Sequence, residues 1–200
     1  MAPAVERIGR RYVFLALMST ALGLAGARSA GAASFTLGEP ERADALRAGQ
    51  KSVTSDEFGA EWRGRDQSGQ TITVMTPYYR LALASRNATF KKEALKPRDI
   101  DSILKESQAK LTLWVTLLGG RADFARFFAP VLVGGPAEVQ PSFVQNERTA
   151  LRDEAGRYAA RCLYVFPAEG LDPRGRVTLV VRDPDSKEMA KFTLDLSAIR

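Results

Sequence analysis

A dense group of hydrogen-bond donors and acceptors lies between residues 142 and 162. Four consecutive polar residues follow the apolar pair Phe143-Val144, namely Gln145, Asn146, Glu147 and Arg148. Arg161 follows in a strand-like run, beside Cys162. An arginine that points inward must be paired, and a paired arginine at a pocket can hold a carboxylate or a phosphate.

We therefore identify a set of candidate ligand-binding residues, which are Arg80, Asn146, Glu147, Arg148 and Arg161. The alternative interpretation is a solvated loop with a structural ion pair, because charged side chains are mostly exposed. The two interpretations differ in whether these side chains line a common pocket.

The sequence contains no histidine and one cysteine. These counts exclude Ser-His-Asp and Cys-His catalysis and the usual zinc sites. Ser102 and Lys105 match the S-x-x-K motif of penicillin-binding enzymes, but the partner motifs S-D-N and K-T-G are absent. We therefore expect no catalytic residue, metal or cofactor, and keep a histidine-independent hydrolase as an alternative.

Residues 1–33 have the three parts of a secretory signal peptide. A polar head with three arginines ends at Arg11, an uncharged apolar run covers residues 12–27, and small residues follow. Gly31-Ala32-Ala33 before Ser34 fits the small-x-small pattern of a cleavage site, so we expect cleavage near Ala33 and Ser34. The pattern predicts a periplasmic or secreted protein.

Two alternatives to a cleaved leader remain open. Residues 12–27 could stay as an inner-membrane anchor, although a bilayer core needs about 20 apolar residues of helix. They could also form a buried helix of the fold. Arg10-Arg11 resembles the head of a twin-arginine leader, but general secretion fits the flanking residues better.

The remaining chain has the size of one domain. We predict a flexible lead-in over residues 34–50, within which a short helix at 41–47 is an option, and one β-rich globular domain over residues 51–200. The formal net charge is +6, of which the leader carries half, and no block of like charge follows. Such a balance predicts no nucleic-acid partner.

Two helices are predicted after a first hairpin. Strands at 60–65 and 71–75 flank the turn-forming segment Asp66–Gln70. Thr76-Pro77 has the form of a helix start, with a capping hydroxyl before proline at the first helical position. A second amphipathic helix begins at Pro97.

Strands predominate after the second helix. Residues 111–117 alternate between apolar residues and Thr112, Trp114 and Thr116, as a half-buried strand does. Further strands are predicted at 131–133, 142–145, 158–166, 177–182 and 188–196, with a short helix at 123–129. The last two strands flank a turn and predict an antiparallel hairpin.

These elements predict an α+β, β-rich fold, with an antiparallel sheet or sandwich and two helices inserted after the first hairpin. The strand spacing of the C-terminal half resembles that of immunoglobulin-like sandwiches, without their paired cysteines.

The sequence favours an exported bacterial protein that acts as a non-enzymatic binding or interaction module of the periplasm or cell envelope. Its expected partner is an envelope protein or a small ligand. We expect contact with the membrane only through the leader, if the leader is not cleaved. The alternatives are a periplasmic carrier of a small anionic or apolar ligand, and the hydrolase.

Overall fold

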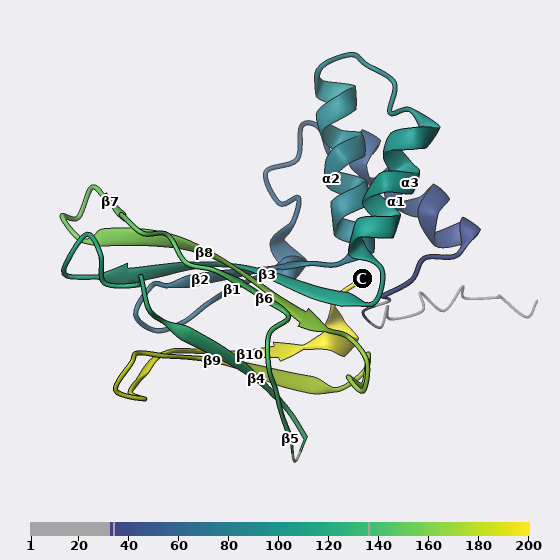
Figure 1. The fold of residues 1–200 in the computed structure, drawn as a ribbon. Coiled ribbons are helices and arrows are strands. Elements are labelled where there is room, and N and C mark those ends of the chain that lie inside the picture. Colours follow the sequence, from purple (N-terminus) through teal and green to yellow (C-terminus); the bar gives the residue numbers. More distant parts are fainter. Residues whose placement is uncertain (1–32, 34, 136) are drawn as a thin grey trace, which may run out of the picture.

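The computed structural model describes residues 33, 35–135 and 137–200. The leader predicted over residues 1–33 therefore lies outside the described residues, except for Ala33. The described chain folds into two antiparallel sheets and a layer of three helices at one end of them (Figure 1). This arrangement confirms the predicted α+β, β-rich fold.

The larger sheet, sheet A, has six strands. Five of them lie in the spatial order β1 (Arg63–Arg65), β2 (Thr71–Met75), β3 (Lys110–Gly119), β8 (Tyr158–Pro167) and β6 (Phe143–Gln145). The short strand β7 (Leu151–Arg152) also pairs with β8, at its other end. The strands at 71–75, 111–117, 142–145 and 158–166 are thus confirmed within a few residues.

The smaller sheet, sheet B, lies under sheet A in Figure 1. Its four strands have the order β10 (Glu188–Asp195), β9 (Arg176–Arg182), β4 (Ala129–Gly134) and β5 (Ala137–Val139). The predicted hairpin of the last two strands is confirmed, because β9 and β10 pair antiparallel with Phe192 opposite Leu179. Residues 122–127 form consecutive turns instead of the helix predicted at 123–129, and Ala129 already belongs to β4.

The hydrophobic core fills the space between the two sheets. Strand β3 contributes Leu111, Leu113, Val115 and Leu117, all of them buried, while the residues between them face outward. The predicted alternation of this strand is therefore confirmed, and it fixes which face of sheet A remains outside the core.

Two of the helices begin where the sequence predicts. Helix α2 (Pro77–Phe90) is capped by Thr76, whose hydroxyl oxygen accepts a hydrogen bond from the Tyr79 amide at 3.1 Å. Helix α3 (Pro97–Ser107) starts at its proline. Both lie above one end of sheet A in Figure 1.

The third helix lies in the segment predicted as a flexible lead-in. Helix α1 (Glu39–Lys51) packs along α2, and its buried residues are Ala45 and Gly49. A Cβ atom on Gly49 would lie 2.2 Å from the Ala82 carbonyl oxygen, so glycine allows the close approach of the two backbones. The short helix that the sequence allowed at 41–47 is therefore present, and it extends to residues 39–51. Small buried residues carry little hydrophobic periodicity, which is why the pattern did not predict its full length.

A cluster of aromatic and polar contacts joins the helical layer to the sandwich. Trp62 lies in the 3-10 helix η1 (Ala60–Trp62), stacks on Tyr79 with ring centroids 4.5 Å apart, and donates a hydrogen bond from Nε1 to the Arg200 carbonyl. The Thr76 hydroxyl donates to the same oxygen. These contacts fix the position of α2 over the edge of the sheet.

Across the described ranges, no helix has the length and apolarity needed to cross a bilayer.

Candidate functional site: a groove on the outer face of sheet A

The outer face of sheet A can be derived from its strand register. Residues directly opposite one another on neighbouring strands share a face of the sheet. Two rows therefore cross the outer face, Thr73–Trp114–Leu163–Gln145 and Met75–Thr112–Val165–Phe143. Most of the second row and the centre of the first are apolar, although this face lies outside the core.

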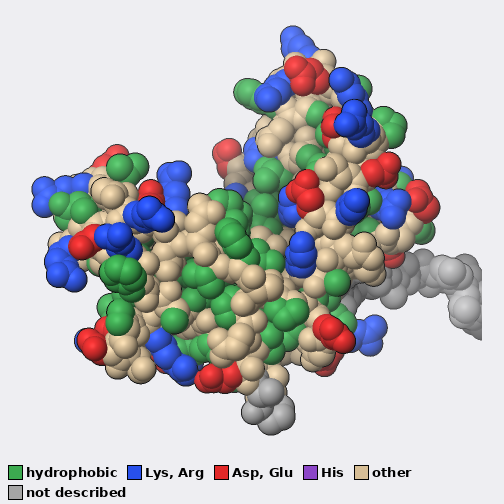
Figure 2. All heavy atoms as spheres, in the orientation of Figure 1, with side chains coloured by type: hydrophobic (Ala, Val, Ile, Leu, Met, Phe, Trp, Pro, Cys, Tyr) green, Lys and Arg blue, Asp and Glu red, His purple; other side chains and the backbone are tan. Residues whose placement is uncertain are grey.

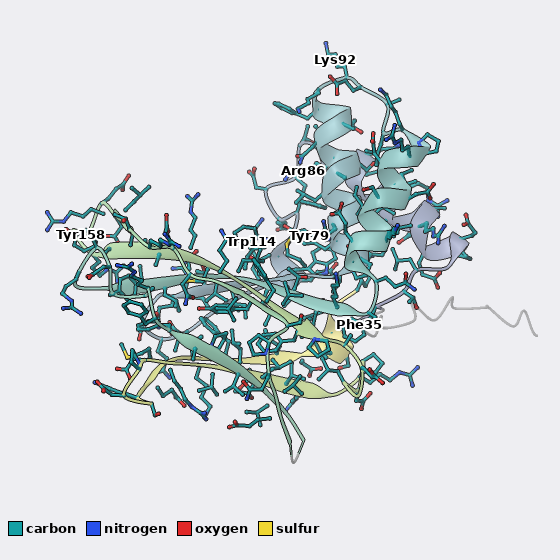
Figure 3. All side chains as sticks on the ribbon, viewed as in Figure 1. Phe35, Tyr79, Arg86, Lys92, Trp114 and Tyr158 are labelled. Atoms are coloured by element: carbon teal, nitrogen blue, oxygen red, sulfur yellow. The ribbon has the colours of Figure 1, made fainter. Side chains whose placement is uncertain are left out.

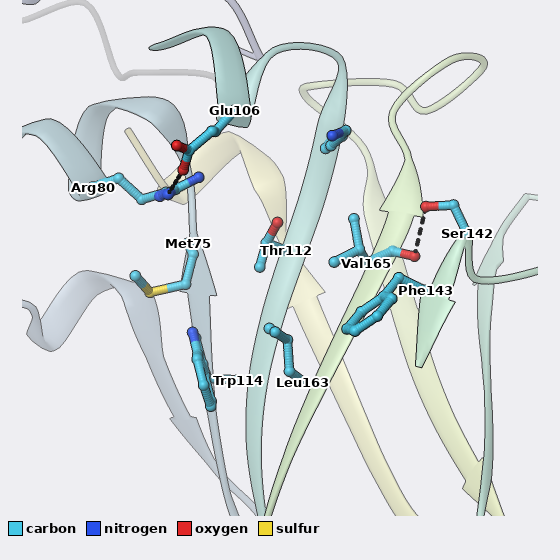
Figure 4. Close-up of a pocket in the computed structure, with 10 residues that line it drawn as sticks. Met75, Arg80, Glu106, Thr112, Trp114, Ser142, Phe143, Leu163 and Val165 are labelled. Atoms are coloured by element: carbon cyan, nitrogen blue, oxygen red, sulfur yellow. Dashed lines mark hydrogen bonds and ion pairs between the residues drawn. The ribbon is translucent and has the colours of Figure 1, made fainter. Parts of the chain in front are cut away.

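The helical layer stands over these rows and turns the face into a groove. The groove has a volume of about 650 Å³ and is open to solvent. We call it the sheet groove, and its lining residues are Met75, Arg80, Glu106, Lys110, Thr112, Trp114, Ser142, Phe143, Leu163 and Val165 (Figure 4). The floor comes from β2, β3, β8 and β6, with Ser142 directly before β6, and the wall comes from α2 and α3.

The floor of the sheet groove exposes large apolar side chains. The exposed fractions of Trp114 and Phe143 are 43% and 49%. Figure 3 places Trp114 on the side of sheet A that carries the helical layer, and Figure 2 shows hydrophobic side chains in the hollow below that layer. Exposed aromatic side chains gathered in a concave surface are typical of a binding site.

The wall of the groove is charged and internally paired. Arg80 donates one hydrogen bond from Nη2 to Glu106 at 2.9 Å and another from Nη1 to the Ser107 hydroxyl at 2.8 Å. The hydrogen bond from Arg80, followed by that from Ser102, lowers the pKa of the Glu106 carboxyl below its ordinary value. Glu106 is therefore ionised at neutral pH, and it neutralises Arg80.

Lys110 is the second cation of the groove. Its side chain forms no ion pair with any residue that the structure describes. The only acid that lines the groove, Glu106, is already held by Arg80. The Lys110 ammonium attracts the Glu106 carboxylate without forming an ion pair with it, so it can still pair with an anionic group that enters the groove.

The structure does not bring the five candidate residues together. Of these, only Arg80 lines the sheet groove. Arg148 and Arg161 are exposed, and they line neither the sheet groove nor the two next best-formed cavities of the described residues.

Asn146 and Glu147 make contacts within the fold. Asn146 donates from Nδ2 to the Phe128 carbonyl at 2.8 Å and accepts at Oδ1 from the Tyr164 hydroxyl at 3.0 Å. Glu147 accepts a hydrogen bond from the backbone amide of Arg161 at 2.6 Å. Both side chains therefore hold the loop after β6 against β8.

Sequence reasoning missed the groove residues Trp114, Phe143 and Lys110. One pattern in the sequence pointed to the first of them. Trp114 occupies an outward position of an alternating strand, between Thr112 and Thr116, where a large aromatic side chain has no core to fill. No pattern indicated that the separate strands carrying Phe143 and Lys110 would lie beside it.

The described residues offer few groups for catalysis. The sheet groove and the two next best-formed cavities are each lined by a single carboxylate, from Glu106, Asp101 and Glu93 respectively. Ser102 is exposed and donates its hydroxyl to Glu106 at 3.1 Å. Cys162 is fully buried, and burial raises the pKa of its thiol. Over the described ranges, no group of three or more acidic or cysteine side chains could hold a metal ion.

Comparisons with known proteins identify no family for this chain. No family model matches the sequence, and no curated protein matches it. One solved structure is similar, a novel protein of unknown function from Burkholderia pseudomallei. The aligned region covers 82% of this chain and 92% of the chain of that structure. Its sequence identity is 10% and its TM-score is 0.40.

Proposed function

We propose that this protein is an exported, non-enzymatic binding module of the bacterial envelope, and that the sheet groove holds an extended apolar segment of a partner protein. One observation carries the proposal. Trp114 and Phe143 are large aromatic side chains that remain about half exposed on the floor of a concave surface. Burial of such side chains is a main source of binding free energy at protein interfaces.

The topology of sheet A supports an extended partner. Strand β6 ends the spatial order of this sheet, so its outer edge has no neighbouring strand among the described residues. Phe143 of β6 also lines the groove. A segment added beside β6 would form main-chain hydrogen bonds at the edge while its side chains contact the groove, which is a common mode of peptide recognition.

Site-specific photo-crosslinking in living cells tests this function. A photoreactive phenylalanine analogue is placed at position 143 of the full chain, and in a second variant at position 127. Phe127 is a suitable control because it is 69% exposed and does not line the groove. We expect one discrete envelope-protein adduct from position 143, lost when Trp114→Ala is added. Equal adducts from both positions, or none from position 143, would contradict the proposal.

A second candidate function is a carrier of a small ligand that combines an apolar body with an anionic group. The unpaired ammonium of Lys110 beside the apolar floor favours it. The fluorescent probe 1-anilinonaphthalene-8-sulfonate has this chemistry. We expect Lys110→Gln to weaken binding of the probe several-fold, and Lys187→Gln, outside the groove, to leave it unchanged. Equal binding of the probe by the two variants would contradict the carrier function, and only the peptide-binding function would remain.

A further inference from the structure

Ala33 lies in the core, although the sequence assigns it to the leader. Its side chain is fully buried and belongs to the main hydrophobic cluster. Its backbone nitrogen donates to the Leu196 carbonyl at 2.9 Å and to the Pro173 carbonyl at 3.2 Å. Cleavage after Ala33, which the Gly31-Ala32-Ala33 pattern allows, would remove a residue that the folded domain uses.

The chemistry of the Ala33 nitrogen favours a free chain end. Two carbonyl oxygens converge on this one atom. A peptide nitrogen has a single proton, which the two oxygens must share. An α-ammonium group has three protons, so each carbonyl receives its own hydrogen bond, and the positive charge strengthens both.

The residues before Ala33 supply the matching recognition sequence. Ala30-Gly31-Ala32 is an A-x-A motif, the form that bacterial signal peptidases recognise. We infer that the leader is removed by hydrolysis of the Ala32–Ala33 peptide bond, and that the mature protein begins at Ala33. One water molecule is consumed, leaving a carboxylate on Ala32 and an ammonium group on Ala33.

After cleavage at this bond, the new N-terminal residue would still be bound to the folded domain. Ala33 is held by the loop before β9 through Pro173, and by η2 (Leu196–Ala198) through Leu196. Leu37, four residues on, is buried as well. The inference rests on the export in the proposed function, but not on binding in the sheet groove.

The test is to express the full chain, with its own leader and a C-terminal tag, in a Gram-negative bacterium. The intact mass and the N-terminal sequence of the periplasmic product are then measured. We expect a chain that starts at Ala33. A start at Ser34 or at any other residue would overturn the inference and leave the export intact, whereas tagged protein that keeps its leader in the cytoplasm would overturn both.

Two reciprocal variants locate the bond independently of the final fold. A bulky residue blocks signal peptidase directly before the bond, where only small residues fit. Ala32→Tyr should therefore accumulate the uncleaved precursor, and Ala33→Tyr should still be cleaved. Both are read as precursor-to-product ratios in total cell extracts. The opposite result would place the bond after Ala33 and would overturn the inference. Binding in the sheet groove is measured separately, on purified protein. An absence of groove binding would therefore not bear on the position of the cleaved bond.

Discussion

The hydroxyl of Tyr164 donates a hydrogen bond to Oδ1 of Asn146 at 3.0 Å, and the same asparagine donates to the Phe128 carbonyl. Tyr164 is fully buried, and burial raises the pKa of its phenol above the ordinary value. Asn146 therefore satisfies two groups that the fold withdraws from water. Its role in this structure is to connect the loop after β6 with β8 and with the start of β4.

Replacing Asn146 tests this structural role. Asn146→Ala removes the hydrogen bond from the Tyr164 hydroxyl and the donor to the Phe128 carbonyl, so we expect the free energy of unfolding to fall by about 1–3 kcal/mol. The measurement is urea denaturation followed by circular dichroism. Arg148→Ala, two residues away and exposed, should change stability by less than about 0.5 kcal/mol. Equal effects of the two variants would contradict the assignment.

The contact between α1 and α2 depends on Gly49. In Gly49→Ala, the added Cβ would lie 2.2 Å from the Ala82 carbonyl oxygen, so the helices must separate. We expect a loss of about 1–3 kcal/mol of stability from this overpacking. Gly120→Ala is the matched control, because its added Cβ meets nothing within 4 Å. A melting temperature equal to that of the control would show that α1 does not pack as described.

The ion pair of Arg80 and Glu106 should weaken in acid. Its hydrogen bonds lower the pKa of Glu106 in the folded state, so the pair stabilises the fold above the unfolded pKa of about 4.3. That contribution disappears as the pH falls through the lowered pKa.

Carboxyl-carbon NMR titration measures this pKa directly. We expect the Glu106 midpoint to lie below that of an unfolded glutamate, and to rise towards it in Arg80→Gln. Arg174→Gln, a substitution away from the groove, should leave it in place. A midpoint that does not respond to Arg80→Gln would mean that the pair does not form in solution.

The two tryptophans should differ in solvent contact. Trp62 is 4% exposed and Trp114 is 43% exposed. Acrylamide quenching of Trp62→Phe, which retains Trp114, should therefore be several-fold stronger than quenching of Trp114→Phe. Similar quenching constants would indicate that the groove floor is covered in solution.

Local patterns in the sequence determined much of the fold. The Thr76-Pro77 cap, the proline at position 97 and the alternation of 111–117 each depend on neighbours in the chain, and each was confirmed. Elements with a weak local pattern were less well predicted. Helix α1 buries alanine and glycine, and only a short helix at 41–47 was considered there. Strands β5 and β7 were missed because they are too short to show a period.

The candidate site could not be derived in the same way. The sequence gathered Asn146, Glu147 and Arg148 because they are adjacent, yet adjacent residues on a strand or loop point in different directions. The structure turns Asn146 inward, to satisfy Tyr164, and leaves Arg148 exposed. Proximity along the chain was therefore no guide to a shared pocket.

By itself, the sequence determined most of the secondary structure, the β-rich class and the lack of histidine chemistry, because these depend on residue type and on local periodicity. Only the tertiary structure decided where a ligand could bind. Trp114, Phe143 and Arg80 lie far apart in the chain and meet in one groove through strand register and the position of α2 over the sheet. Register is set by pairing between distant segments, which no local pattern contains.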